Sequence, residues 1–250
     1  MRGTRNESFR TYSGRYVWPL DPRPEDIDLV DVAHALARIN RFNGHTTVPY
    51  SVAEHAGRVS HLVEQLARGL HGPVPHAPDC LPLGQVGACT CRSLMAEHGD
   101  LGIMALALWG LHHDDSEYLL VDLPHPIKHA EGLGTAYLEA ERRMMACVCR
   151  HFGLLLREPY LVTVADRVML WVEQRDLMNA GARDRCACAP FTALADSLPT
   201  LLPGDYAQAE QAYIQRHRDL TRATRAFDSG SLTGVPPPVG DPESRWGAGV

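Results

Sequence analysis

The chain contains, near its middle, the segment Trp109-Gly-Leu-His-His-Asp-Asp-Ser-Glu-Tyr-Leu-Leu-Val-Asp-Leu-Pro-His-Pro-Ile-Lys128. An apolar run, Gly102 to Leu111, leads into it and is followed by six polar residues, five of which can ionise. A buried helix over this run would hold His113 and Asp114 rigidly at its end. Adjacent imidazole and carboxylate groups suit a divalent metal that keeps positions open for water and substrate, because neutral nitrogen and anionic oxygen bind it without filling its shell. The segment therefore predicts a metal site.

Glu117 follows this pair, four residues after His113 and three after Asp114. On a continuing helix these offsets place the three side chains on one face. We therefore expect Glu117 to handle a proton beside the metal. The alternative is a polar helix end with solvated acids, because a His-Asp dipeptide occurs by chance in many chains.

Motifs on both sides of the pair match the pattern of a known superfamily. They are Tyr16-Val-Trp-Pro-Leu20, Ser51-Val-Ala-Glu-His55, His113-Asp-Asp-Ser-Glu117, Asp122-Leu-Pro-His-Pro-Ile-Lys128 and Ala165-Asp166. With these motifs in this order, the chain resembles the HD-domain metal-dependent phosphohydrolases. Within that superfamily it is most similar to the 5'-deoxynucleotidases and the phage dATP triphosphohydrolases. The resemblance implies an all-α helical bundle that hydrolyses a deoxynucleotide.

The resemblance also implies a ligand set for a divalent cation, with Zn, Co and Mn as candidates. The set is His55, His113, Asp114 and Asp166. Asp166 lies on an otherwise apolar helical turn, where a buried carboxylate is costly unless it is paired or metal-bound. In this interpretation the metal lowers the pKa of its water from near 15.7 toward roughly 7 and polarises the phosphoryl oxygen. Glu117 orients that water or donates to the leaving group.

Substrate-binding residues are carried over from the same resemblance. Trp18 would lie beside the deoxyribose and exclude a 2'-hydroxyl, and Asp122 would meet the sugar. Lys128 would neutralise phosphate, with Arg41 as a weaker candidate. The related nucleotidases have arginine before the tryptophan, whereas this chain has Val17, so one phosphate contact has no counterpart at this position. The alternatives are that Trp18 packs as a core anchor and that Arg41 belongs to a capped helix end.

Three functions remain open at this point. The first is a deoxynucleotide phosphohydrolase, which releases phosphate from a dNMP or triphosphate from a dNTP, because both cuts use the same metal and water. The second is an HD enzyme for another nucleotide class, a cyclic nucleotide or a guanosine polyphosphate; Trp18 and the turn at Asp122 argue against it. The third is a non-catalytic metal-bound binding or scaffold protein, which an intact ligand set with Glu117 disfavours.

Composition narrows the partners and the location. The chain has 250 residues, 45% of them hydrophobic, with a net charge of −6 and a pI of about 6.1. This balance provides no global basic surface for duplex nucleic acid. The longest apolar run is far shorter than the roughly 18 residues of a membrane span, and the N-terminus lacks a signal-peptide core. We therefore expect a cytoplasmic protein with no membrane contact and no duplex nucleic acid as partner. The resemblance implies a small-molecule deoxynucleotide as its partner, and we expect the chain to form a homo-oligomer.

Apolar spacing and capping signals predict a series of helices joined by turns. The expected helices span residues 26–41, 51–69, 101–120, 134–152, 158–180 and 206–227. In the second of these, Ser51 and Glu54 form a capping box that fixes His55 early in the helix. Residues 11–24 are expected to be extended, because their prolines disfavour helix.

We expect one HD domain over residues 12–227, with an inserted loop at 69–99 and a disordered tail at 228–250. Glycine and proline dominate the insertion, which we interpret as a lid or a contact between subunits. The tail has too few apolar residues to offset its ordering entropy. Among the seven cysteines, Cys80, Cys89 and Cys91 share the insertion with histidines. A structural zinc site there is the alternative to free, buried thiols.

Overall fold

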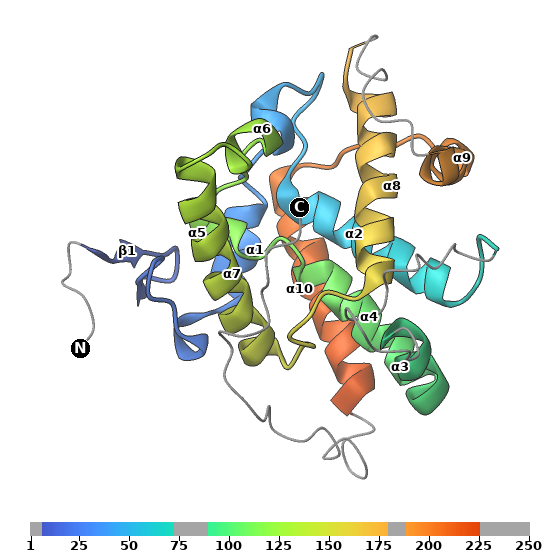
Figure 1. Cartoon of the computed structure of the whole chain (residues 1–250), viewed down its shortest axis with the longest axis horizontal. Coiled ribbons are helices and arrows are strands. Elements are labelled where there is room, and N and C mark those ends of the chain that lie inside the picture. Colours follow the sequence, from blue (N-terminus) through green and yellow to red (C-terminus); the bar gives the residue numbers. More distant parts are fainter. Residues whose placement is uncertain (1–6, 73–89, 180–188, 226–250) are drawn as a thin grey trace.

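Helices form nearly all of the regular secondary structure in the computed structural model, which describes residues 7–72, 90–179 and 189–225 (Figure 1). The long central helices are α2 (Val52–Ala67), α4 (Asp100–His112), α8 (Tyr160–Leu177) and α10 (Tyr206–Arg225). α2 packs against the other three. Apolar side chains such as Val59, Leu106 and Val168 are fully buried between them. The expected all-α bundle is confirmed.

A second group of helices packs beside this centre. It comprises α1 (Leu29–Leu36), α5 (Glu117–Leu120), α6 (His125–Lys128) and α7 (Leu133–Phe152). Val32, Leu111 and Met144 belong to its buried cluster. Leu154 packs against both clusters, so the core is continuous. Two short helices lie farther out: α3 (Thr90–His98) contacts α4, and α9 (Ala189–Ser197) contacts α8 (Figure 1).

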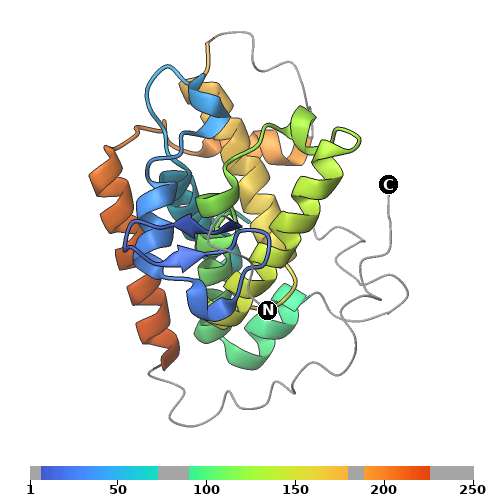
Figure 2. The ribbon, with the colours of Figure 1, turned by 90° about the vertical axis from the view of Figure 1, so that its left-hand side faces the viewer.

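The first described residues form a small hairpin (Figure 2). Strand β1 (Phe9–Arg10) pairs antiparallel with β2 (Tyr16–Val17). The buried carboxylate of Asp31 on α1 anchors the turn, because it accepts the hydroxyl of Thr11 at 2.7 Å and the amide of Ser13 at 2.6 Å. The segment expected to be extended is therefore a strand and turns, and a 3-10 turn, η2 (Pro24–Asp26), begins at its end.

Side-chain caps set several helix ends. The helix expected over residues 26–41 is reduced to α1, because the Asp28 carboxylate accepts the amide of Val30 at 2.9 Å and starts the helix there. Ser51 caps α2 as expected, accepting the amide of Glu54 at 3.2 Å. The Glu54 carboxylate bonds Arg58 instead of returning to the Ser51 amide, so only half of the capping box is formed by the described residues. The helices expected at 134–152, 158–180 and 206–227 are observed as α7, α8 and α10, with ends shifted by a few residues.

The prediction of a loop over residues 69–99 is wrong for the last third of that range. Thr90–His98 is helical, and Cys91 of this helix is buried in the apolar core. Burial in that core is the environment of a packing cysteine, which is the buried thiol of the two expected roles. Cys80 and Cys89, like the predicted tail, lie outside the described residues. None of the described helices is long and apolar enough to cross a bilayer.

Candidate metal centre

The helix that leads to the His-Asp pair ends earlier than the sequence suggested. α4 stops at His112, and residues 113–116 form a turn before α5 begins at Glu117. In this turn the Asp115 amide bonds the carbonyl of His112, and the Glu117 amide bonds that of Asp114. These bonds reach back three residues rather than four, which tightens the backbone. The expectation of one continuous helix over residues 101–120 is therefore wrong.

Four side chains converge here: His113 and Asp114 from the turn itself, His55 from α2 and Asp166 from α8. His55 Nε2 on α2 lies 3.2 Å from His113 Nε2, 3.6 Å from Asp114 Oδ2 and 3.1 Å from Asp166 Oδ1 on α8. His113 Nε2 lies 3.1 Å from Asp114 Oδ2 and 3.8 Å from Asp166 Oδ1. Ligand atoms bound to one ion at metal distances of roughly 2.1 Å stand about 3.4 Å apart in a tetrahedron. The separations bracket this value, and His55, His113 and Asp166 could hold a metal ion.

Asp166 differs from expectation in one respect. Its side chain is 39% exposed, so it is not the buried carboxylate that the apolar surroundings suggested. His55 is fully buried and the His113 side chain is 7% exposed, so the ligand set opens to solvent on the Asp166 side. An open side is what a metal needs if substrate or water is to reach it.

A close approach of α4 to α2 brings the two histidines together. A Cβ atom at Gly110 would lie 3.0 Å from Val63 Cγ2 and 3.3 Å from Ser60 Cα. A side chain at this position would force its neighbours on α2 to shift by a few tenths of an ångström. Gly110 is three residues before His113 and packs against α2 one to two turns after His55, so glycine here favours the close spacing of the two histidines.

Both histidines present Nε2 to the ligand cluster because Nδ1 is held elsewhere. His113 Nδ1 lies 2.9 Å from the carbonyl oxygen of Gly110, and His55 Nδ1 lies 2.5 Å from Glu173 Oε1. A carbonyl or carboxylate at Nδ1 assigns the proton to that nitrogen and leaves Nε2 with a lone pair for a metal. Glu173 additionally raises the basicity of the His55 ring, which strengthens it as a ligand.

Glu173 is a buried hub that connects α8 to α2 and to the preceding loop. Besides His55, its carboxylate accepts the hydroxyl of Tyr50 at 3.0 Å and Nε of Arg41 at 3.1 Å. Burial by itself raises the pKa of Glu173, but the charges of Arg41 and His55 hold it below its usual value. The carboxylate is therefore kept ionised although it is fully buried.

Arg41 pairs with the carboxylates of Glu173 and Asp114. Its Nη1 lies 3.5 Å from Asp114 Oδ2, in addition to the bond to Glu173. Burial by itself lowers the pKa of Arg41, but Glu173 and Asp114 raise it above its usual value. Its predicted role in phosphate binding stays a prediction, and the structure adds a positioning role that the sequence did not suggest.

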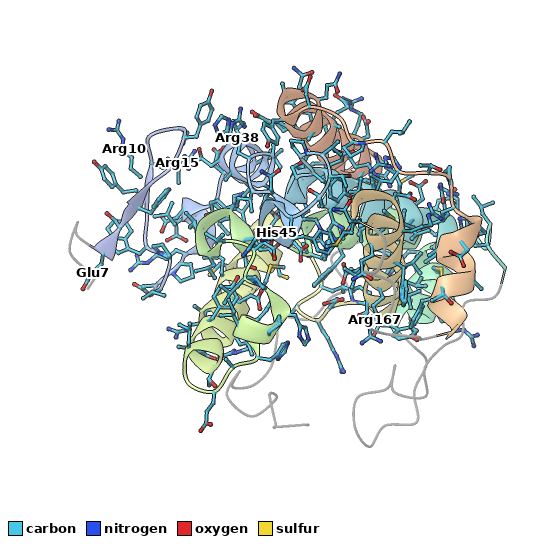
Figure 3. All side chains as sticks on the ribbon, turned by 90° about the horizontal axis from the view of Figure 1, so that it is seen from above. Glu7, Arg10, Arg15, Arg38, His45 and Arg167 are labelled. Carbon is cyan, nitrogen blue, oxygen red and sulfur yellow. The ribbon has the colours of Figure 1, made fainter. Side chains whose placement is uncertain are left out.

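The loop that carries Arg41 is strained. Within η3 (Arg41–Gly44), Phe42 and Asn43 have φ angles of 54° and 50°, left-handed values that cost on the order of 1–3 kcal/mol in a non-glycine residue. The loop is closed at its base by the pairing of Asn40 with Ser51. In the view from above, His45 at its end lies between the hairpin with Arg10 and the helix with Arg167 (Figure 3). The strain is tolerated because the loop is anchored through Arg41 and its base.

Glu117 begins α5 and remains close to the ligands despite the break in the helix. It is 5% exposed, and its Oε2 is buried with no hydrogen-bond partner among the described residues. Burial first, and then the charges of Asp114 and Asp122, raise the pKa of Glu117 well above its usual value. A carboxyl group with a raised pKa and a free oxygen beside the ligands is suited to hold or transfer a proton.

The other predicted substrate-binding residues, Asp122, Lys128 and Trp18, are not members of the ligand cluster. Burial first, and then the charge of Asp114, raise the pKa of Asp122 although Arg41 opposes this, so Asp122 lies within reach of the charges at the centre. Lys128 Nζ lies 2.5 Å from Glu141 Oε1 on α7, which partly neutralises the cation expected to meet phosphate. Trp18 follows β2, is half-buried, and its carbonyl accepts the amide of Asp21. The substrate contacts of these residues stay predictions.

Similarity to known proteins gives the family. No family model matches the chain. An uncharacterized protein of Rhodobacter capsulatus, RCAP_rcc00048, is 31% identical over 222 residues, which cover 86% of this chain and 95% of that protein. The chain belongs to the family of RCAP_rcc00048. The Escherichia coli protein YfdR is 28% identical over 169 residues, 68% of this chain and 71% of YfdR.

In this member of the RCAP_rcc00048 family, two carboxylates that the sequence did not single out bond predicted site residues: Glu173 bonds His55, and Glu141 bonds Lys128. Glu173 lies seven residues after Asp166, two helical turns along the same face of α8, in an otherwise apolar stretch. That spacing could have identified it. Glu141 lies among the polar residues of an amphipathic helix, and no local signal distinguishes it from its neighbours.

Proposed function

We propose that this chain is a metal-dependent phosphohydrolase that acts on deoxynucleotides. The observation that carries the proposal is the convergence of His55, His113, Asp114 and Asp166 with a buried carboxyl group beside them. Two imidazoles and two carboxylates form a mixed donor set that suits Zn, Co or Mn rather than Ca or Cu(I). The resemblance of the motifs to HD-domain phosphohydrolases supports the same reaction class.

The chain's own residues would divide the work as follows. His55 and His113 would hold the ion through Nε2, and Asp114 and Asp166 through carboxylate oxygens. A divalent cation held there would lower the pKa of water toward roughly 7 and polarise a phosphoryl oxygen. Glu117 would hold a proton on its free Oε2, ready for the leaving group, or accept one from water once ionised. Glu173 would keep His55 in the correct tautomer throughout.

The proposal is tested with a panel of substrates. The purified chain, loaded with Zn²⁺, Co²⁺ or Mn²⁺ in turn, is incubated with dNMPs, dNTPs, the matching ribonucleotides, cyclic nucleotides and a guanosine polyphosphate. We expect release of phosphate or triphosphate from deoxynucleotides. Turnover of a cyclic nucleotide or a guanosine polyphosphate alone would reassign the substrate, and metal binding without turnover of any compound would favour a binding protein.

Glu117→Gln tests the proton-transfer role. We expect the variant to bind metal like the wild type and to lose about 10²–10⁴-fold in kcat, because a neutral amide cannot exchange the proton. Metal content and kcat are measured on the same preparation. A variant with near wild-type kcat would remove Glu117 from the chemistry.

Sugar selectivity tests the predicted role of Trp18. If the indole lies against the deoxyribose, Trp18→Ala should narrow the ratio of kcat/KM for dATP over ATP, because the steric penalty on the 2'-hydroxyl, worth about 1–3 kcal/mol, is removed. Asp122→Ala should weaken both substrates alike, because the 3'-hydroxyl is common to them. An unchanged ratio in Trp18→Ala, with lower stability, would show that Trp18 only packs.

A further inference from the structure

A second buried polar cluster lies next to the ligand pair and has no part in the chemistry proposed above. It consists of His112, Asp115, Tyr213 and His217, and we call it the rear network. His112 and Asp115 are fully buried, and Tyr213 is 1% exposed. The network connects the end of α4 and the following turn to α10, a helix that contributes none of the predicted ligands.

The contacts of the rear network use both ring nitrogens of His112. Nδ1 lies 2.6 Å from Asp115 Oδ2 and 2.9 Å from the Tyr213 hydroxyl, and that hydroxyl also donates to the other carboxylate oxygen of Asp115. On the opposite edge, Nε2 lies 2.8 Å from His217 Nδ1. With His112 donating from Nδ1 to Asp115, its Nε2 accepts from His217. Phe152 stacks on the imidazole with ring centroids 4.1 Å apart.

Two residues of the rear network flank the candidate ligand pair in the sequence. His112 precedes His113, and Asp115 follows Asp114. The turn is closed twice, by the Asp115 amide on the carbonyl of His112 at 3.2 Å and by the side-chain contact of the same two residues at 2.6 Å. A change in this closure must therefore move both ligands between them.

Burial makes the closure rigid. A buried carboxylate or imidazole that loses a partner is left as an unsatisfied polar group, because no water can replace the lost bond. Tyr213 bonds both His112 and Asp115, so its hydroxyl ties the closed turn to α10. The position of α10 and the geometry of the turn are thus coupled, because the Tyr213 hydroxyl bonds both residues that close the turn. The contact of His217 with His112 adds a second connection between α10 and the end of α4.

We propose that the rear network positions His113 and Asp114 for the metal, so that metal affinity depends on the contact between the turn and α10 at Tyr213. Its members are positioning residues that act through the backbone of the turn. The inference rests on the proposed metal centre, but it does not depend on the substrate or on catalysis.

The test compares the loss of the contact between α10 and the turn with the loss of a contact between α10 and α2. Tyr213→Phe removes only the hydroxyl that meets the turn, and Asp115→Asn removes the charge at the other end of that bond. Arg216→Ala is the matched control, because Arg216 anchors α10 to α2 instead, with Nε 3.0 Å from Ser60 Oγ and Nη2 2.7 Å from Glu64 Oε2. For each full-length protein, the Zn²⁺ dissociation constant is measured by competition with a chelator, and the melting temperature is measured without metal.

We expect Tyr213→Phe and Asp115→Asn to bind Zn²⁺ about 10-fold more weakly, while Arg216→Ala keeps its affinity within about twofold although it lowers the melting temperature. Equal affinities in all four proteins, or equal losses in Tyr213→Phe and Arg216→Ala, would overturn the inference. A wild-type chain that does not bind Zn²⁺, Co²⁺ or Mn²⁺ would overturn it together with the metal centre. Because the readout is binding, a lack of deoxynucleotide hydrolysis refutes the proposed function alone.

Discussion

At the scale of single residues, the buried carboxylate of Glu173 holds three side chains of the candidate metal centre in place. A carboxylate taken fully out of water costs several kcal/mol unless charges and hydrogen bonds replace its hydration. Arg41, Tyr50 and His55 supply that replacement. Each of them is in turn held by the carboxylate, so the orientation of a candidate metal ligand and the position of a strained loop depend on one side chain.

Glu173→Gln should therefore weaken metal binding by about 10–100-fold and lower the free energy of unfolding by about 3 kcal/mol. The amide leaves the charge of Arg41 without its closest anion and makes the imidazole of His55 a weaker base. Metal titration and denaturant unfolding measure the two effects. Glu64→Gln is the control, because it neutralises an Arg-paired carboxylate on α2 at a distance from the ligands. Wild-type metal affinity in Glu173→Gln would contradict the assignment.

At the scale of elements, the spacing of α2 and α4 decides whether the two histidines can share an ion. Their Nε2 atoms are 3.2 Å apart, close to the ideal edge of about 3.4 Å for ligands on one metal. The helices can approach this closely because Gly110 presents no side chain to Ser60 and Val63. Packing at one glycine is thus linked to ligand geometry one turn away.

Gly110→Ala should cost about 1–3 kcal/mol of stability and weaken metal binding, because its methyl group would push α4 off α2. Gly57→Ala provides a matched control on α2, since a Cβ atom there meets nothing within 4 Å. In a helix interior that control should be neutral or slightly stabilising. Thermal unfolding and metal titration of both variants check this. Equal effects of the two substitutions would show that the close approach has no influence on the centre.

At the scale of the whole molecule, the ligand set joins parts of the chain that are far apart in sequence. His55 is separated from His113 by 58 residues, and Asp166 lies on yet another helix. A metal that binds this set binds only the folded state, so it must stabilise the fold. The same ion would neutralise part of the negative charge that Asp114 and Asp166 bring together.

Saturating metal, at about 100 times its dissociation constant, should add about 2.7 kcal/mol of stability. For a chain of this size that corresponds to a rise in Tm of roughly 5–11 °C. Scanning calorimetry with Zn²⁺ and with a chelator measures the difference. Asp166→Ala should abolish most of the rise, because it removes a ligand from the exposed side of the site. Identical Tm values with and without metal in the wild type would argue against the centre.

The sequence alone determined the features that depend on neighbours within a few residues. Ser51 starts α2 and places His55 in its first turn, and the apolar run before His113 forms a buried helix that ends at the ligand pair. Capping, helical periodicity and the polarity of a helix end are local effects. They were sufficient for the all-α fold and for the candidate pair His113 and Asp114, while the motif resemblance supplied His55 and Asp166.

Only the tertiary structure decided which buried polar side chains pair across separate helices. The bond between His55 and Glu173 spans 118 residues, and the rear network joins His112 to Tyr213 across 101 residues. No local pattern encodes such pairs, because each forms only when separate helices have packed. The pairing of Lys128 with Glu141 has the same origin. Burial removes water as a partner, and each buried charge then bonds whichever opposite group the fold brings within reach.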